Sequence, residues 1–355
     1  MRDVLRNMEE YDHEQVLFGY DKVSGLRCII AIHNTTLGPA LGGLRIWPYK
    51  NEDEALFDVL RLSRGMTYKN SGMGLDFGGA KSVIIADPNK EKPEELLRAF
   101  GRMVESLGGR YITAEDVGST LEDMMTIRKE TKYVAGLPET SGNPSPVTAY
   151  GVLQAMRATA KHVWGNESLE NKKVAVQGCG NVGLSLIEQL IQAGATVYAA
   201  DMFENKLQRA VKAGAIPVEQ DKVFDVEADI FAPCALGAVL NDETIPKLKV
   251  KAVCGSANNQ LLEPRHGKAL AARGIVYAPD FIVNGGGVIN VAEEFAPGGY
   301  NKERAYKKAA GIYDILLKVF AIATERKIEP YEAAKVLAEE RIRKALEQKR
   351  MYLGR

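Results

Sequence analysis

Cysteine and histidine are both scarce in this sequence, with four of each in 355 residues. The cysteines, Cys28, Cys179, Cys234 and Cys254, are scattered singly beside apolar residues, and neither a C-x-x-C nor an H-E-x-x-H motif occurs. This pattern lacks the ligand spacing of a zinc site and the density of a disulfide framework. We therefore expect buried, reduced thiols and a mechanism that uses no metal.

An excess of one charge and long apolar runs are missing as well. The 46 basic and 46 acidic residues balance, so neither nucleic acid nor an anionic membrane is indicated as a partner. No apolar stretch is long enough to span a bilayer, and residues 1–15 lack the apolar core of a signal peptide. We expect a cytoplasmic protein that acts on a small molecule.

The length predicts two domains, because 355 residues exceed the usual size of one hydrophobic core. Gly, Pro and Ser cluster at 136–146, as in a hinge. Beyond this cluster, strand and helix patterns alternate, which is typical of a parallel sheet covered on both faces. We predict an α/β fold with a first domain at 1–136 plus about 329–355, and a doubly wound Rossmann domain at 137–328.

The first half contains a lysine in an unusual place. Strands are predicted at 26–33 and 82–86, and a helix at 51–70 with Asn51 as N-cap and Glu54 closing a capping box. Lys81 stands just before the second strand, after two glycines, so its stem is expected to be enclosed. Burial would lower the pKa of this lysine and make a neutral amine available for proton transfer.

Two other ionisable residues also lie beside glycine or small residues, namely Lys69 in "GMTYKN" and Asp116 in "TAEDVG". The alternative for any such lysine is a solvated surface charge. A phosphate-binding P-loop is rejected for "GLDFGGAKS", because Ala80 occupies the lysine position of that motif and a strand follows it.

A dinucleotide site is predicted at "VAVQGCGNVG", where Gly178, Gly180 and Gly183 form G-x-G-x-x-G between a strand and an apolar helix. The glycines allow a tight turn, close approach of a pyrophosphate and close helix packing. Asp201 ends the next strand, where a carboxylate accepts from ribose hydroxyls and repels a 2′-phosphate, so NAD is favoured over NADP. The alternative is a Rossmann-like sheet that binds no nucleotide.

Nine segments in consistent order resemble one family, the amino-acid dehydrogenases that act on glutamate, leucine, phenylalanine and valine. These segments are LGPALGGLRIWPY, RLSRGMTYKN, FGGAKSVI, GRYITAEDVG, GNPSPVTAYGV, QGCGNVG, DIFAPCALGAVLND, GSANNQL and YAPDFIVNGGGVINVAEE. The resemblance covers nearly the whole chain and is strongest to the leucine dehydrogenases.

The resemblance implies an NAD-dependent oxidative deamination of an L-amino acid to its 2-oxo acid, with release of ammonia. It implies that Lys69 binds the substrate carboxylate, that Lys81 activates water, and that Asp116 exchanges protons with the departing nitrogen. It assigns the first domain to substrate binding and oligomerisation. Further residues expected to line the dinucleotide or the substrate are Thr148, Asn181, Val182, Ala235, Asn258 and Asn284.

The same resemblance bears on the substrate side chain. Glutamate-preferring relatives carry a lysine before the paired glycines, here Gly42 and Gly43, whereas this chain has Leu41. A glutamate substrate whose distal carboxylate faces leucine would lose about 1–3 kcal/mol of binding free energy. Branched aliphatic substrates are therefore favoured: leucine, and also valine and isoleucine. Residues expected to complete an aliphatic pocket are Ala114, Val288 and Val291. Two departures from leucine-type members are Ala80, whose methyl group could crowd Lys81, and Gly285.

Two other functions stay open, a phenylalanine dehydrogenase and a non-catalytic NAD-binding sensor. Family members are commonly oligomers, often octamers, so a homo-oligomer is expected. Residues 16–18 are a candidate contact between subunits.

Overall fold

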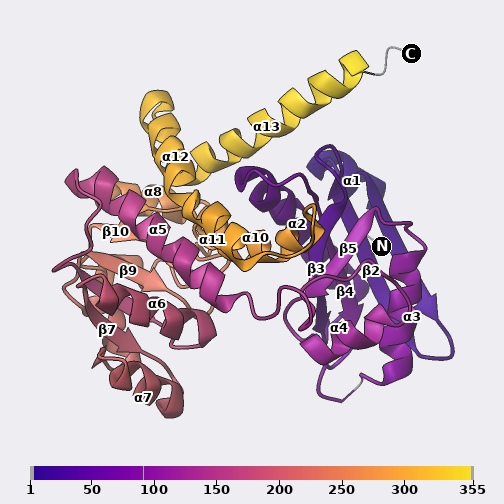
Figure 1. Ribbon diagram of the computed structural model, residues 1–355, viewed down its shortest axis with the longest axis horizontal. Helices are drawn as coiled ribbons and strands as arrows, with labels where there is room; N and C mark the ends of the chain where they lie inside the picture. Colours follow the sequence, from indigo (N-terminus) through magenta and orange to yellow (C-terminus); the bar gives the residue numbers. More distant parts are fainter. Residues whose placement is uncertain (1–3, 91, 353–355) are drawn as a thin grey trace. The chain divides into compact units, whose positions relative to one another are not determined.

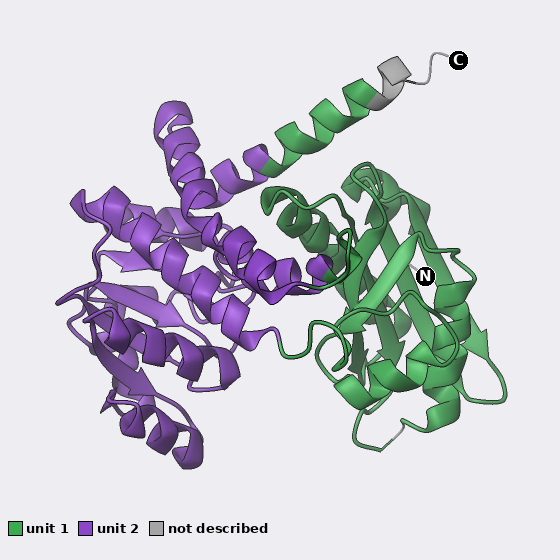
Figure 2. Ribbon diagram, viewed as in Figure 1, with its two compact units in different colours: residues 1–143, 294–300, 338–355 green, residues 144–293, 301–337 purple. Residues whose placement is uncertain are grey.

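The computed structural model describes residues 4–90 and 92–352, which divide into two compact units. Unit 1 comprises residues 1–143, 294–300 and 338–355, and unit 2 comprises residues 144–293 and 301–337 (Figure 2). The segment 294–300 therefore belongs to unit 1 although its neighbours on both sides belong to unit 2. Among the described residues, every helix is too short or too polar to cross a membrane.

Unit 1 is built on a five-stranded mixed sheet with the order β1-β2-β4-β3-β5 (Figure 1). Its elements are α1 (Val4–Tyr11), β1 (Gln15–Asp21), β2 (Leu26–Asn34), β3 (Ala40–Trp47), α2 (Glu52–Gly72), β4 (Gly78–Ile85), α3 (Glu94–Glu105), β5 (Tyr111–Glu115) and α4 (Leu121–Arg128). β1 and β2 are antiparallel, as are β2 and β4, whereas β3 is parallel to both β4 and β5.

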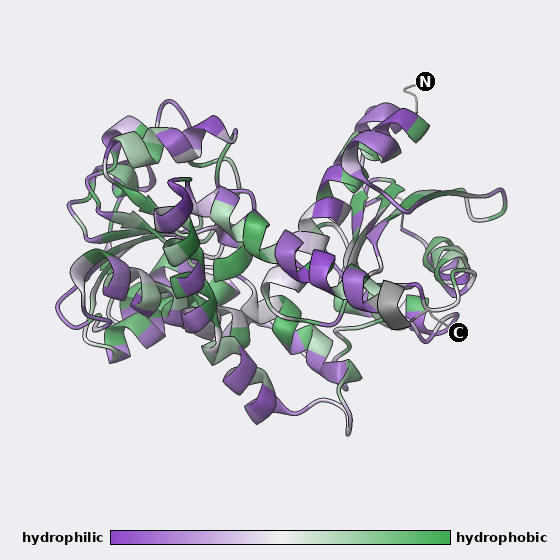
Figure 3. Ribbon diagram, turned by 90° about the horizontal axis from the view of Figure 1, so that it is seen from above, coloured by the Kyte–Doolittle hydropathy of each residue, from purple (hydrophilic) through white to green (hydrophobic). Residues whose placement is uncertain are grey.

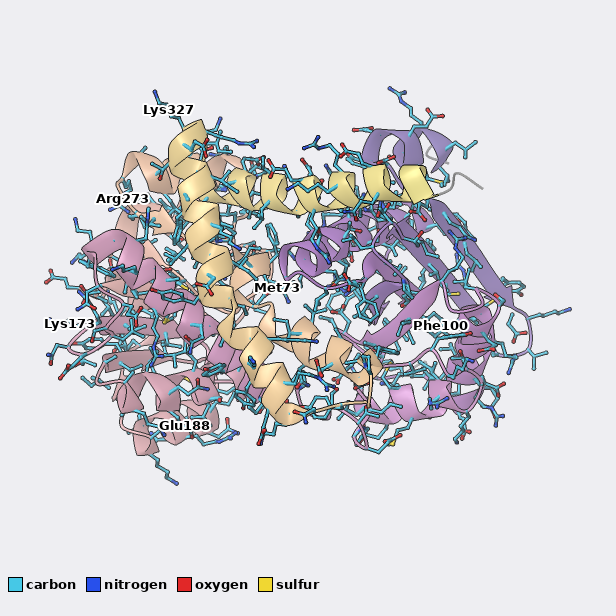
Figure 4. All side chains as sticks on the ribbon, turned by 45° about the horizontal axis from the view of Figure 1, so that its top comes forward. Met73, Phe100, Lys173, Glu188, Arg273 and Lys327 are labelled. Atoms are coloured by element: carbon cyan, nitrogen blue, oxygen red, sulfur yellow. The ribbon has the colours of Figure 1, made fainter. Side chains whose placement is uncertain are left out.

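Apolar side chains cover both faces of this sheet. Residues from α3 and α4 pack on one face, where Phe100, labelled in Figure 4, is fully buried. On the other face, Leu56, Val59 and Leu60 of α2 pack against strand residues such as Val83. Since side chains alternate along a strand, the residues of β4 with odd numbers face α2.

Two local predictions in this unit need correction. The strand β4 begins at Gly78 rather than at residue 82, so Lys81 lies within the strand and not before it. Both glycines that precede Lys81 also lie in β4, and Gly79 is required because α2 comes close: a Cβ on it would lie 2.1 Å from the Thr67 nitrogen. Asn51 does cap α2, but the Glu54 carboxylate accepts from the N–H of Lys50 instead of the cap residue.

Unit 2 contains a six-stranded sheet with the order β11-β10-β9-β6-β7-β8, and all of its strand pairs are parallel. The strands are β6 (Lys173–Gln177), β7 (Thr196–Ala200), β8 (Ile216–Pro217), β9 (Ile230–Pro233), β10 (Ala252–Val253) and β11 (Val276–Tyr277). Numbered from the first strand of the unit, the order is 3-2-1-4-5-6, which is that of a Rossmann fold and confirms the predicted fold class.

The helices of unit 2 are α5 (Ser145–Trp164), α6 (Asn181–Gln192), α7 (Glu204–Lys212), α8 (Arg265–Ala272), α9 (Asp280–Val283), α10 (Gly286–Ala292), α11 (Lys302–Ala310) and α12 (Ile312–Arg326). Helix α13 (Pro330–Tyr352) begins in unit 2 and passes into unit 1 after residue 337. Short 3-10 helices occur at Gln220–Asp225, Ile245–Lys247 and Glu293–Phe295. Figure 3 shows the strands inside unit 2 in the green of apolar residues, whereas its outer helices mix purple, white and green.

Candidate active site

Lys81 and Asp116 meet on the α2 face of the sheet in unit 1. Lys81 lies in the middle of β4 and is only 5% exposed. Its Nζ lies 3.0 Å from Oδ1 of Asp116, which follows β5 directly. Lys81 lies in β4 and Asp116 comes after β5, and β3 lies between these two strands in the sheet. The pair places a cation and a carboxylate, the two kinds of group used in acid–base catalysis, in direct contact.

Asp116 has a second cationic partner that the sequence analysis missed. The Nε of Arg45 donates to Oδ2 of Asp116 at 3.1 Å. Burial raises the pKa of Asp116, but the charges of Lys81 and Arg45 outweigh it and the pKa is lowered overall. The carboxylate is therefore held in its ionised form between two cations.

A position two residues after Gly43 in a strand lies on the same face as Gly43, so the alternation of β3 was a signal that could have pointed to Arg45.

The paired glycines leave room for this cluster. The register of β3 brings Gly43 opposite Lys81 on one side and Ala114 on the other. A Cβ on Gly43 would lie 2.8 Å from the Cβ of Asp116, and one on Gly42 would lie 1.7 Å from the carbonyl oxygen of Ala80. Any larger residue would displace the backbone that carries the ion pair.

Ala80 does not crowd Lys81. Its side chain is fully buried in the layer beneath α3, on the opposite face of the sheet from Lys81. The expectation that its methyl group presses on the lysine was wrong, because neighbouring residues of a strand face opposite sides.

Lys69 lies in the last turn of α2, half-buried, and Met73, labelled in Figure 4, caps that end of the helix. The next residue, Asn70, is fully buried and was also missed from the sequence. Its Nδ2 donates to the carbonyl oxygen of Gly78 at 2.5 Å and of Leu41 at 3.4 Å. Asn70 thereby ties the end of α2 that carries Lys69 to the first residues of β3 and β4.

Two residues expected beside the substrate side chain lie in unit 1. Leu41 is 2% exposed, and Ala114 is half-buried in the neighbouring strand β5. Both lie on the α2 face by alternation. Val288 and Val291 are half-buried and share one side of α10 in unit 2. That these four residues form one pocket stays a prediction.

The glycine motif of unit 2 follows β6 and begins α6. Gly178 has φ of 101°, and a Cβ on it would lie 2.7 Å from the Cβ of Ala235, which follows β9. This is the point at which the strand order reverses, where open α/β sheets bind ligands. Gly183 packs with its Cα against the carbonyl oxygen of Gly178, since a Cβ there would approach it to 2.0 Å.

The start of α6 fits a pyrophosphate. Gly180 is the N-cap, and a Cβ built on it would find open space, with nothing within 4 Å among the described residues. Asn181 and Val182 open the first turn, where backbone N–H groups attract an anion.

Asp201 lies at the end of β7 and accepts from two backbone N–H groups, that of Cys179 at 2.7 Å and that of Phe203 at 2.9 Å. The first of these bonds holds the carboxylate beside the glycine turn. A dinucleotide with its pyrophosphate at α6 and a ribose near Asp201 therefore fits the residues present.

A second group of predicted residues gathers around α10. The Nδ2 of Asn284 donates to Oδ1 of Asn258 at 2.8 Å, while its own Oδ1 is buried without a partner among residues 4–90 and 92–352. Thr148 lies on α5, where a Cβ on Gly287 would meet its Oγ1 at 2.9 Å. The orphaned oxygen of Asn284 can accept from an amide or an amino group of a ligand.

No cluster of three or more His, Cys, Asp or Glu side chains that could hold a metal ion occurs in the described part of the chain.

Family models match nearly the whole chain. Residues 13–133 match the Glu/Leu/Phe/Val dehydrogenase dimerisation domain, and residues 141–203 and 200–350 match the Glutamate/Leucine/Phenylalanine/Valine dehydrogenase model.

Individual relatives agree with the family models. The chain is 58% identical to leucine dehydrogenase of Thermoactinomyces intermedius, over 94% of this chain and 92% of that protein. It is 51% identical to phenylalanine dehydrogenase of Caldalkalibacillus thermarum, over 94% and 92%. Among solved structures, L-tryptophan dehydrogenase from Nostoc punctiforme has a TM-score of 0.86 at 45% identity, covering 96% of this chain and 99% of that one.

Proposed function

This chain belongs to the Glu/Leu/Phe/Val dehydrogenase family and is an amino-acid dehydrogenase, and we propose that it oxidatively deaminates branched-chain aliphatic L-amino acids with NAD. Leucine is the preferred substrate in this proposal, with valine and isoleucine as further substrates, and the reaction is reversible. The observation that carries the proposal is the buried contact of 3.0 Å between Lys81 and Asp116.

Each ionisable group has a task in the proposed reaction. Lys69 binds the substrate carboxylate, for which a cation at a helix end is suited. The Asp116 carboxylate, kept ionised by its two cationic neighbours, accepts a proton from the substrate nitrogen. Lys81 takes a proton from the water that adds to the imino carbon. Contact with Asp116 at 3.0 Å holds the Nζ of Lys81 in place for this step.

The cofactor proposal rests on unit 2. NAD, when bound, accepts the hydride from the α-carbon of the substrate. Gly178, Gly180 and Gly183, with Asn181 and Val182, would hold its pyrophosphate, and Asp201 would accept from its ribose hydroxyls. Residues proposed to line the rest of the dinucleotide are Thr148, Ala235 and Asn258. Asn284 would bind the amino-acid substrate through its Oδ1, which has no partner among the described residues.

Substrate preference follows from the apolar residues on the α2 face. Leu41 and Ala114 leave a distal carboxylate without a partner, and we propose that Val288 and Val291 complete this aliphatic lining. Phenylalanine is the second candidate substrate, supported by the 51% identity to a phenylalanine dehydrogenase.

The test is the formation of NADH when the protein is mixed with NAD and a panel of L-amino acids at mildly alkaline pH. The panel comprises leucine, isoleucine, valine, phenylalanine, tryptophan and glutamate. We expect the largest kcat/KM for leucine and the smallest for glutamate. A larger kcat/KM for phenylalanine or tryptophan would replace the aliphatic assignment, and no turnover with any of them would favour the non-catalytic NAD-binding sensor.

Assembly and location are part of the same proposal. The enzyme is proposed to be a homo-oligomer, with an octamer as the assembly that the resemblance implies. The dimerisation model covers β1, an edge strand on which Phe18 is 54% exposed, and this supports a subunit contact at residues 16–18. Light scattering measures the mass as a multiple of 38.8 kDa. We place the enzyme in the cytoplasm, in line with four free cysteines, all within the described residues.

A further inference from the structure

Five charges of alternating sign form a row across the α2 face of unit 1. Arg61 donates to Asp58 at 2.9 Å, and Asp58 accepts from NH1 of Arg45 at 2.8 Å. The Nε of Arg45 donates to Asp116 at 3.1 Å, and Asp116 contacts Lys81 at 3.0 Å. The row thus runs from the surface of α2 to the proposed catalytic pair.

The middle of this row is shielded from solvent. The side chains of Asp58, Arg45 and Asp116 are 16%, 20% and 21% exposed, so water screens their interactions only in part. The phenol of Tyr49 also donates to Oδ2 of Asp58, at 2.7 Å. Two donors on one carboxylate oxygen hold the far end of Arg45 in place.

The strand holds the near end of Arg45. Arg45 is paired with Val83 in β4, and the residue before it, Leu44, is paired with Glu115 in β5. Asp116 itself lies one residue beyond β5, where its backbone N–H donates to Ser119. The direction of its carboxylate is therefore set by side-chain contacts rather than by a strand pairing.

We propose that Arg45 is a positioning residue of the deamination, which holds Oδ2 of Asp116 so that Oδ1 stays against the Lys81 amine, and that Asp58 in turn holds Arg45. This inference rests on the proposed function, because it assigns a task in that reaction. It requires arginine at this position: Nε and NH1 of one planar group serve two carboxylates, whereas a lysine nitrogen cannot bridge them in the same geometry.

The two positioning residues differ in charge, and this gives a test with opposite signs. Without the Arg45 cation, burial of Asp116 is opposed by Lys81 alone, so the pKa of the carboxyl rises. Without the Asp58 anion, the cation of Arg45 acts on Asp116 with nothing to offset it, so that pKa does not rise. Both changes loosen the carboxylate and slow the reaction.

The experiment measures kcat, KM and the pH profile of kcat/KM for Arg45→Met, Arg45→Lys and Asp58→Asn. We expect Arg45→Met to lower kcat about 100-fold, the effect of misplacing a reacting group by about an ångström, with a smaller change in KM. Its acid limb should move up by about 1–3 pH units. Arg45→Lys should lose rate with little movement of the acid limb, and Asp58→Asn should lose rate without an upward movement.

Arg27→Met is the matched control. Arg27 lies in β2 of the same sheet and pairs with Glu52 of α2 at 2.7 Å, but both side chains are exposed. This variant should keep kcat and the pH profile. Equal rate losses at Arg27 and Arg45, or an unmoved acid limb in Arg45→Met, would overturn the positioning role.

A second measurement does not depend on turnover. Infrared pH titration of protein labelled with carboxyl-¹³C aspartate follows the Asp116 band, which is assigned by its absence in Asp116→Asn. A higher midpoint in Arg45→Met than in the parent protein supports the inference, and an unchanged midpoint refutes it. If the midpoint is higher in Arg45→Met but the parent protein oxidises no amino acid, the electrostatic coupling stands and the proposed function fails. Should Arg45→Met not fold, Arg45→Gln carries the same comparison, because it also removes the cation beside Asp116.

Discussion

Replacement of Lys81 by alanine separates chemistry from cofactor binding. The change removes the Nζ that lies 3.0 Å from Asp116 and leaves that carboxylate with Arg45. Loss of a general acid–base group lowers kcat by about 10²–10⁴-fold. The residues proposed to hold NAD all lie in unit 2, so the dissociation constant of NAD should change by less than about twofold, or about 0.4 kcal/mol.

The same variant should lose some stability. Removal of one partner of a fully buried ion pair costs about 3–5 kcal/mol. Here Arg45 stays in contact with Asp116 and a fifth of that side chain is exposed, so about 1–3 kcal/mol is expected. Urea unfolding measures this loss of stability, titration of protein fluorescence measures NAD binding, and NADH absorbance measures turnover.

Lys92→Ala serves as the control, because Lys92 forms another partly buried pair in unit 1, with Asp123 at 2.8 Å. It should cost comparable stability and leave kcat nearly unchanged. If Lys81→Ala weakened NAD binding as much as it lowered kcat, or retained more than a tenth of the parent kcat, the lysine would not be the proposed acid–base group.

Three further outcomes are expected. Gly79→Ala should destabilise unit 1 by at least about 1–3 kcal/mol in urea unfolding, because its Cβ would lie 2.1 Å from a backbone nitrogen of α2. Gly65→Ala is the control: a Cβ there has nothing within 4 Å among the described residues, so this change should stabilise α2. Burial lowers the pKa of His13 from 6.5 to about 4 and that of His33 to about 3. As the pH drops from about 6.5 to 4, the histidines of the unfolded chain take up protons before those of the folded protein, so the melting temperature should fall. A melting temperature that stays constant over this range would contradict the burial of both rings. Asp201→Ala should raise kcat/KM with NADP relative to NAD by about tenfold or more, since the repulsion of a 2′-phosphate is removed; an unchanged ratio would show that the carboxylate does not face the ribose.

Much of unit 2 could be predicted because its signals are local. Most of the parallel strands read as short apolar runs, and the glycines at 178–183 carry the turn within six residues. The bond from Cys179 to Asp201 joins two strand ends that are neighbours in every Rossmann sheet. The exception is β8, whose two residues, Ile216 and Pro217, are both exposed and form no buried apolar run.

Unit 1 is different because the residues of its proposed catalytic cluster are not local in sequence. Arg45 and Asp116 lie 71 residues apart in sequence, and β3 is inserted between β4 and β5, out of chain order. Alternation along a strand places Ala80 and Lys81 on opposite faces and Gly43 and Arg45 on the same face. Only the strand order and register bring Arg45 next to Asp116.

The amino-acid sequence by itself determined the α/β class, the glycine turn proposed to bind the dinucleotide, and Lys69, Lys81 and Asp116 as candidates, since strand periodicity, caps and glycine turns act over a few residues. The tertiary structure alone decided which charges touch. Strand order and register bring together side chains from distant segments, and the resulting ion pairs, with the lowered pKa of Asp116, depend on burial that only the packed sheet provides.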